Sequence, residues 1–129
     1  MADKAKEKNI RINFENHRVT LTDNTKSARK LLDDIDRDNV YVYWQPQADD
    51  SEGDRIEAIK TLHDKITNVH VFNWDKDFNR YPLIEAKDEW KSYIKNLGGD
   101  RAYLLEFVRD DNIEQFKEDA KVLKNMLGG

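Results

Sequence analysis

The chain alternates apolar, strand-like segments with segments whose apolar residues recur every three or four positions. Residues 40–44, 69–72 and 102–108 have the strand-like pattern, and a helical pattern follows each of them. Residues 40–44 are apolar or aromatic on both faces, which is typical of a central strand that is covered on both sides. Strands and helices in alternation, with short connections, indicate a parallel sheet with right-handed crossovers.

The start of the chain predicts a further part of this sheet. Apolar and polar residues alternate over residues 10–14, and the alternation resumes at 19–21 after Glu15-Asn16-His17. This pattern predicts either a hairpin that turns at residues 15–17 or one long bent edge strand. We therefore predict an α/β fold: a three-layer sandwich with a mainly parallel sheet of about five strands and four helices. The N-terminal hairpin or bent edge strand comes first, followed by βαβαβα.

A length of 129 residues favours one domain. Residues 1–9 have no periodic apolar residue, so we expect a flexible charged tail there, followed by a single α/β domain over residues 10–129. No apolar run approaches the roughly 20 residues that span a bilayer, and no signal-peptide pattern is seen, so we expect a cytoplasmic protein without a membrane partner.

Several classes of chemistry are excluded by missing residues. The chain has no cysteine, which rules out disulfides, thiolate metal sites and thiol nucleophiles. Neither G-x-G-x-x-G nor G-x-x-x-x-G-K occurs, and no serine lies in a G-x-S-x-G elbow. The three histidines, His17, His63 and His70, have no metal-ligand spacing, and we interpret His70 as a core residue of a strand.

The charge is unevenly distributed. The net charge is −4, but residues 1–32 carry +4, residues 33–54 carry −7 and residues 55–129 carry −1. The acidic residues before and after the strand at 40–44 belong to opposite ends of the sheet, about 15–20 Å apart. Clustered Lys and Arg, which phosphate contacts need, are missing, so we expect no direct contact with nucleic acid.

The acidic residues before the strand at 40–44, within residues 33–38, lie at the C-terminal end of a predicted helix, where the helix dipole disfavours carboxylates. Such residues are either simply solvated or form a surface for a basic protein. The main hypothesis is a small acidic binding or regulatory module, inhibitor- or immunity-like, non-catalytic and without a cofactor, for a basic protein partner. The predicted partner-binding residues are Asp33, Asp34, Asp36, Asp38 and Trp74.

The alternative hypothesis concerns the loops that follow the strands. Ligands of open α/β sheets bind beyond the carboxyl ends of the strands, and three polar loops meet there. Carboxylates could hold Mg²⁺ and an arginine could bind phosphate, although Asp is also common in loops and helix caps. This predicts a Mg²⁺-dependent phosphate-ester enzyme or a nucleotide-derivative binder. The rim residues are Asp49, Asp50, Asp75, Asp77, Arg80, Arg109 and Asp110.

Overall fold

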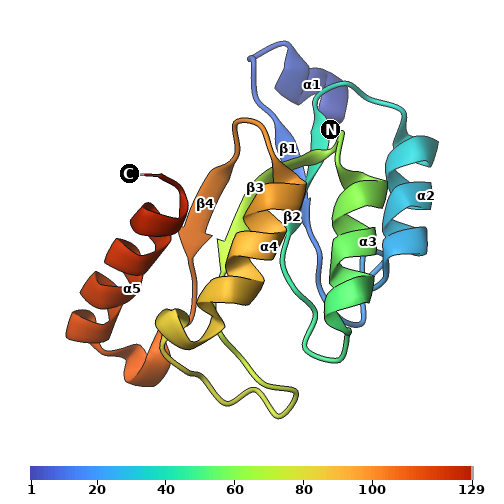
Figure 1. Cartoon of the computed structure of the whole chain (residues 1–129). Coiled ribbons are helices and arrows are strands. Elements are labelled where there is room, and N and C mark those ends of the chain that lie inside the picture. Colours follow the sequence, from blue (N-terminus) through green and yellow to red (C-terminus); the bar gives the residue numbers. More distant parts are fainter. Residues whose placement is uncertain (129) are drawn as a thin grey trace.

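The computed structural model describes residues 1–128 and contains one sheet of four parallel strands (Figure 1). The strands are β1 (Ile12–Glu15), β2 (Val40–Trp44), β3 (Ile66–Val71) and β4 (Ala102–Leu105). Their order in the sheet is the order in the sequence, β1-β2-β3-β4. The register pairs Phe14 with Val42 and His70 with Leu104, and it shifts between Val42 and Tyr43 where β2 meets β3.

Four longer helices connect and follow the strands: α2 (Thr25–Ile35), α3 (Glu52–Leu62), α4 (Lys87–Leu97) and α5 (Ile113–Met126). Right-handed crossovers between strands that are neighbours in order place every helix on the same face of the sheet. Accordingly, α2, α3, α4 and α5 lie side by side as one layer (Figure 1). On the opposite face, which we call the open face, the described residues 1–128 form no helix layer.

The predicted α/β class, the mainly parallel sheet and the four helices are confirmed. The structure differs from the prediction in having four strands where about five were expected. It also has one helix layer where the three-layer sandwich required two. The sequential strand order is the cause, because helices fall on both faces only when the direction of strand addition reverses.

The missing strand is the second arm of the predicted N-terminal hairpin. Beyond β1 the chain forms turns over residues 16–24, and Val19 has a positive φ of 59° and is 94% exposed. Hydroxyl groups stabilise these turns, since Thr22 donates to the backbone oxygen of Glu15 and Thr20 donates to that of His17. β1 is therefore a single edge strand.

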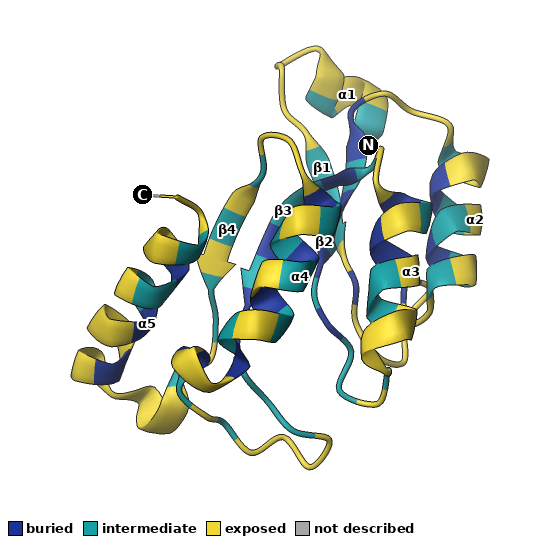
Figure 2. Cartoon of the chain, in the orientation of Figure 1, coloured by how far each residue is buried: buried dark blue, intermediate teal, exposed yellow. Residues whose placement is uncertain are grey.

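The core lies between the sheet and the helix layer. Along β2 the burial alternates, with Val40, Val42 and Trp44 buried and the two tyrosines between them partly exposed (Figure 2). The expectation that both faces of this strand are covered is thus met on the helix side only. Within residues 1–128 no helix has the length and apolar character needed to cross a lipid bilayer.

The N-terminal segment and the starts of the helices α3, α4 and α5 have local structure of their own. Residues 1–9, expected as a flexible tail, contain the short helix α1 (Ala2–Lys6), and Asn39 donates a hydrogen bond to the backbone oxygen of Ala2. Ser51 and Asp54 form a capping box at the start of α3. The short 3-10 helices η1 (Leu83–Ala86) and η2 (Arg109–Asp111) precede α4 and α5. Gly129, the last residue of the predicted domain, lies outside the described residues.

Candidate functional site

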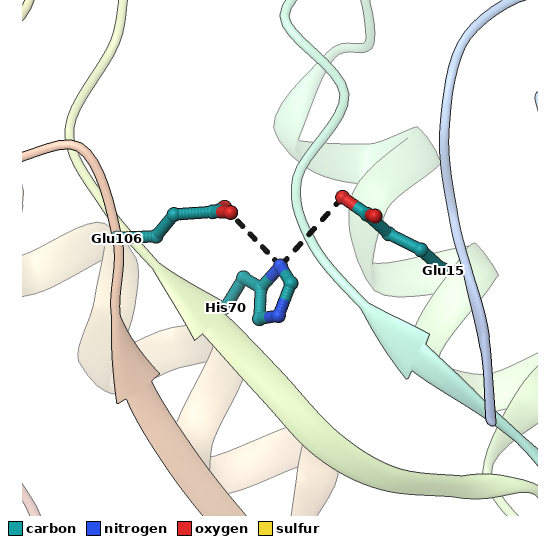
Figure 3. Close-up of side chains that lie close together, drawn as sticks. All are labelled: Glu15, His70 and Glu106. Carbon is teal, nitrogen blue, oxygen red and sulfur yellow. Dashed lines mark ion pairs between the residues drawn. The ribbon is translucent and has the colours of Figure 1, made fainter. Parts of the chain in front are cut away.

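Three ionisable side chains from three strands meet on the open face. Glu15 ends β1, His70 is the penultimate residue of β3, and Glu106 directly follows β4 (Figure 3). Alternation along each strand places them there, because neighbouring residues such as Phe14, Val69 and Leu105 contribute to the core instead. All three lie toward the carboxyl ends of the parallel strands, where α/β sheets and barrels carry their ligand sites.

The three side chains converge on one atom. Nδ1 of His70 lies 3.1 Å from a carboxylate oxygen of Glu106 and 3.9 Å from one of Glu15 (Figure 3). The ligand atoms of the three residues all lie within 4.8 Å of one another. Gln45, which directly follows β2, adds a side-chain oxygen 2.9 Å from the same nitrogen. We call Glu15, Gln45, His70 and Glu106 the strand-end cluster.

The cluster is partly shielded from solvent. The His70 side chain is 12% exposed, whereas those of Glu106 and Glu15 are 25% and 45% exposed. Burial raises the pKa of Glu106, His70 opposes this rise, and the negative charge of Glu15 adds to it. Two carboxylates that share one small site repel each other, so the cluster has a deficit of positive charge.

This geometry fits a divalent cation. Metal–ligand bonds of about 2.1 Å place neighbouring ligands about 3.0–3.5 Å apart, close to the distances around His70 Nδ1. A protonated Nδ1 has a single hydrogen for the three surrounding oxygens, whereas a cation can bind several oxygens together with the nitrogen lone pair. A donor set that mixes imidazole with carboxylates suits Mn²⁺ or Zn²⁺ better than Mg²⁺.

A cavity of about 160 Å³ opens beside the cluster. Gln45 belongs to both, and His17, Arg18, Trp74 and Phe78 form much of the remaining wall. Arg18 lies over the Phe78 ring at 5.6 Å. The cavity therefore offers a small ligand an apolar aromatic wall and a cationic group next to the candidate metal site.

His17 has a defined orientation at this cavity. Its Nδ1 lies 2.9 Å from the backbone oxygen of Arg18, so in the neutral ring this nitrogen carries the hydrogen and donates it. In this tautomer the other ring nitrogen, Nε2, carries the lone pair. The cavity that His17 lines is also lined by Gln45, so His17 lies on the same cavity wall as a member of the strand-end cluster.

The predicted rim residue Asp75 organises its own loop. It accepts hydrogen bonds from the backbone of Asp77 and Asn79, the Asn79 amide and the Tyr81 hydroxyl. These hydrogen bonds, led by that of the Asn79 side chain, hold the pKa of Asp75 below its usual value. Asp75 and Asp77 therefore lie together in one turn. Within residues 1–128 they do not belong to a group of three or more side chains placed to hold a metal ion.

Four of the other predicted rim residues pair with nearby charges. Arg80 binds Asp111 at 2.7 Å, Arg109 binds Asp110 at 3.4 Å, and Asp49 binds Arg18 at 3.1 Å. Burial raises the pKa of Asp50, and Asp54 adds to this rise. The rim residues are thus spread over separate loops and do not converge with the strand-end cluster.

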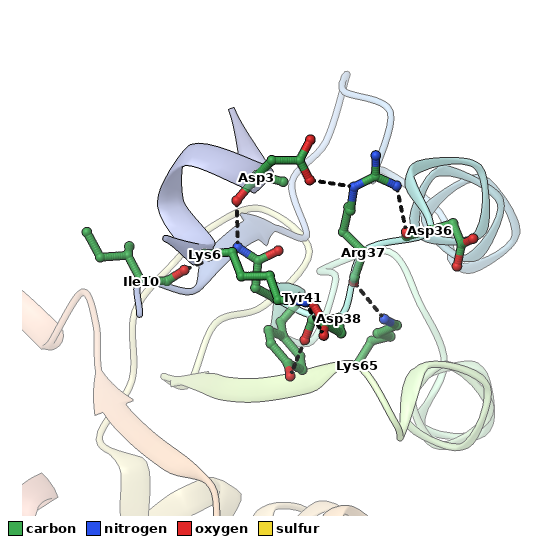
Figure 4. A network of polar contacts seen from close by, with 10 residues as sticks. Asp3, Lys6, Ile10, Asp36, Arg37, Asp38, Tyr41 and Lys65 are labelled. Carbon is green, nitrogen blue, oxygen red and sulfur yellow. Dashed lines mark hydrogen bonds and ion pairs between the residues drawn. The ribbon is translucent and has the colours of Figure 1, made fainter. Parts of the chain in front are cut away.

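The acidic residues at the end of α2 are largely neutralised within the chain. Asp33 pairs with Arg29, Asp34 with Lys30 at 2.6 Å, and Asp38 with Lys6 at 2.7 Å. Figure 4 shows the surrounding network, in which α1 reaches this end of the sheet. Asp36 instead ends α2 in the left-handed conformation, with φ of 43°. The free negative charge predicted for residues 33–54 is therefore smaller than the sequence sum indicates. Lysine and arginine side chains from residues 1–32 neutralise part of it.

Trp74, the fifth predicted partner-binding residue, packs inside an aromatic group. Its ring lies 4.4 Å from Phe72, 4.9 Å from Phe107 and 5.9 Å from Phe78. The residue is half-buried and forms an isolated backbone bridge with Arg80. Trp74 therefore lines the cavity beside the strand-end cluster rather than forming an exposed anchor for a partner.

Comparison with known proteins finds similarity in structure only. No family model matches the chain, and no curated protein matches its sequence. The structure is similar to the crystal structure of the probable 3-DHS dehydratase AsbF, involved in petrobactin synthesis, from Bacillus anthracis. The TM-score is 0.76 at 19% sequence identity, and the similarity covers 99% of this chain and 53% of AsbF.

The chain thus spans about half the length of AsbF. Its four strands in sequential order, each followed by a helix on one face, correspond to four consecutive units of a (β/α)₈ barrel. The hypothesis of a non-catalytic inhibitor or immunity protein is wrong, because the similar structure is that of an enzyme. The alternative hypothesis of a strand-end enzyme site agrees better with this likeness, although the convergent residues differ from the predicted rim.

Proposed function

We propose that the chain carries the metal-binding part of a divalent-cation-dependent enzyme, with the metal held by Glu15, His70 and Glu106. The observation that supports this proposal is the convergence of three side chains from three strands within 4.8 Å. The shared fold with a dehydratase supports an enzyme of the same broad class, one that removes water from a small hydroxylated substrate. The predictions of a phosphate-ester or nucleotide substrate and of a cytoplasmic location remain untested.

A bound divalent cation would supply a Lewis acid that polarises a carbonyl or hydroxyl oxygen of the substrate. In a dehydration, a base takes a proton from carbon, a C–O bond breaks, and the released hydroxide leaves as water after gaining a proton. His17 is the candidate base, because its Nε2 is the free ring nitrogen and its ring lines the adjacent cavity. Arg18 would bind an anionic group of the substrate, such as a carboxylate.

The proposal is tested by calorimetric titration of the metal-free protein with Mn²⁺. We expect one Mn²⁺ site per strand-end cluster. The affinity for Mn²⁺ should fall at least about tenfold in the Glu106→Gln and His70→Gln variants. The matched controls are Asp77→Asn and Asp110→Asn, which remove carboxylates from the predicted rim and should leave the affinity unchanged. Equal affinity in all five proteins would overturn the cluster as the metal site.

The proposed reaction class is tested separately with 3-DHS as the probe substrate, following loss of one water by mass spectrometry. Under the proposal, turnover requires the added metal and is lost in the His17→Gln variant, which should still bind Mn²⁺. A His17→Gln variant with unchanged turnover would remove His17 from the base role and leave the metal site standing.

A further inference from the structure

The sheet has two free edges that are complementary to each other. β1 and β4 are the outer strands, and within residues 1–128 neither pairs with another strand on its outer side. On β1 the amides of Ile12 and Asn16 point inward to β2, so the peptide groups of the alternate residues Asn13 and Glu15 point outward. On β4 the amide of Glu106 points inward to β3, so those of Tyr103 and Leu105 point outward.

We propose that a second copy of this chain pairs with both edges and closes an eight-stranded parallel barrel. All four strands are parallel, so a two-fold axis along the barrel sets β4 of each copy beside β1 of the other, in the same direction. Both seams are then identical and use only donors and acceptors that the single chain leaves free. This inference rests on the sheet edges and goes beyond the proposed function.

An apolar groove marks where the neighbouring unit would pack. A hollow of about 460 Å³ lies between β4 and α5 and is lined mainly by apolar side chains. Leu104, Phe116 and Leu127 contribute to it and are 41–46% exposed. In a closed barrel, β1 and α2 of the second copy occupy this position, since each strand and its helix pack beside the preceding unit. Water would then leave both the groove and the open face of the sheet.

The charges of the two seam partners are opposite in sign. Residues 1–35, which contain β1 and α2, carry +2. Residues 102–129, which contain β4 and α5, have six acidic and four basic side chains and carry −2. A second copy therefore brings a positive segment against a negative one at each seam, which favours this arrangement over edge pairing of like segments.

Closure also changes the strand-end site. Because Glu15 is the last residue of the edge strand β1 and Glu106 directly follows the edge strand β4, Glu15 of one copy comes beside Glu106 of the other. The rim then carries two strand-end clusters, and loops from both copies surround each cavity. Bound divalent cations would offset the repulsion between these carboxylates, so Mn²⁺ should tighten the association of the two copies.

The first test is sedimentation equilibrium of the purified chain, with and without Mn²⁺. We expect twice the 15.3 kDa mass of one chain. Phe116→Lys and Leu127→Lys, which place a charge in the groove, should shift the protein toward the monomer. The matched control is Ile84→Lys, because Ile84 is 51% exposed but lies in η1. A monomer for the unmodified chain at high concentration overturns the proposal and leaves the edges to a different chain or segment.

The second test uses the absence of cysteine. A chain carrying both Asn13→Cys and Leu104→Cys has its two thiols on opposite outer strands, so a disulfide across the seam must join two copies. Oxidation should give a covalent dimer with two disulfides, whereas Asn13→Cys with Ile84→Cys should not. If the protein binds Mn²⁺ but stays monomeric, barrel closure is rejected and the proposed metal site is retained. If the protein dimerises but has no affinity for Mn²⁺, the metal site is rejected and barrel closure is retained.

Discussion

Glu15 and Glu106 end or follow the two outer strands of the sheet, yet both direct a carboxylate oxygen to Nδ1 of His70, at 3.9 and 3.1 Å. Three strand spacings in a flat sheet measure about 14 Å. The two side chains therefore lean toward each other across the open face and gather negative charge at one point. This gathering of carboxylates around one imidazole is the arrangement that the proposed cation site needs.

The first prediction concerns pH. Because burial raises the pKa of Glu106 above its ordinary value of 4.5, the metal-free folded protein holds this proton at pH values where the unfolded chain has released it. The contribution of Glu106 to the free energy of unfolding is therefore present at low pH and declines as the pH rises through the raised pKa. Urea unfolding in the presence of EDTA should show this decline, and Glu106→Gln should remove it. Identical pH slopes for both proteins would contradict the prediction.

The second prediction separates the loop role of Asp75 from metal binding. Asp75→Ala removes the acceptor of four hydrogen bonds and should increase amide hydrogen exchange across residues 75–81. Because its pKa is lowered, the wild-type carboxylate stabilises the loop above about its ordinary value of 3.8 and loses this effect as the pH falls through the lowered pKa. Mn²⁺ affinity should not change. A large loss of Mn²⁺ affinity would return Asp75 to the metal site.

The third prediction concerns the core beneath the site. Trp44 is 1% exposed and packs edge-on against Trp90 and Tyr93, with ring centroids 6.3 and 5.4 Å away. Trp44→Ala should lower the free energy of unfolding by about 3–5 kcal/mol. Ile84→Ala, at a residue that is 51% exposed, should change it by less than about 1 kcal/mol. Chemical denaturation measures both, and a similar small loss in both variants would be inconsistent with this core.

The fourth prediction concerns Arg55, which links α3 to α4. Its guanidinium donates to Glu89 at 2.5 Å and to the backbone oxygen of Gln47 at 2.9 Å, and its side chain is 15% exposed. Arg55→Met keeps the apolar stem but removes the cation beside the Glu89 carboxylate and one of the donors to the Gln47 oxygen, so we expect a loss of about 1–3 kcal/mol. Lys30→Met, in the exposed pair with Asp34, should have little effect. Equal effects in thermal unfolding would contradict the assignment.

Much of the fold was predictable because periodicity is local. The segments of residues 40–44 and 102–105 show their strand pattern within a few residues, and the α2 and α5 helices show theirs. The number of helix layers was not predictable in this way, since it depends on the strand order. The hairpin prediction failed because the polar turns at 16–24 contain Val19 and Leu21, which imitate a strand pattern but are exposed.

The strand-end cluster was missed for a different reason. Glu15, His70 and Glu106 are far apart in the sequence and form no spaced motif, so only the sheet brings them together. A signal was nevertheless present. Each strand, with the bounds that the structure gives it, has a polar residue at or next to its carboxyl end on the face opposite its core residues, and Gln45, directly after β2, follows the same rule. The prediction instead chose acidic residues in the loops, of which Asp49 and Asp110 pair with neighbouring arginines.

The most direct test of the account is the position of bound Mn²⁺, measured by paramagnetic broadening in NMR spectra of the isotope-labelled protein. The account predicts that substoichiometric Mn²⁺ broadens the signals of Glu15, Gln45, His70 and Glu106 first, and that those of Asp34 and Asp77 persist. Broadening centred on Asp77 or on the end of α2, with the His70 signals intact, would contradict the central claim.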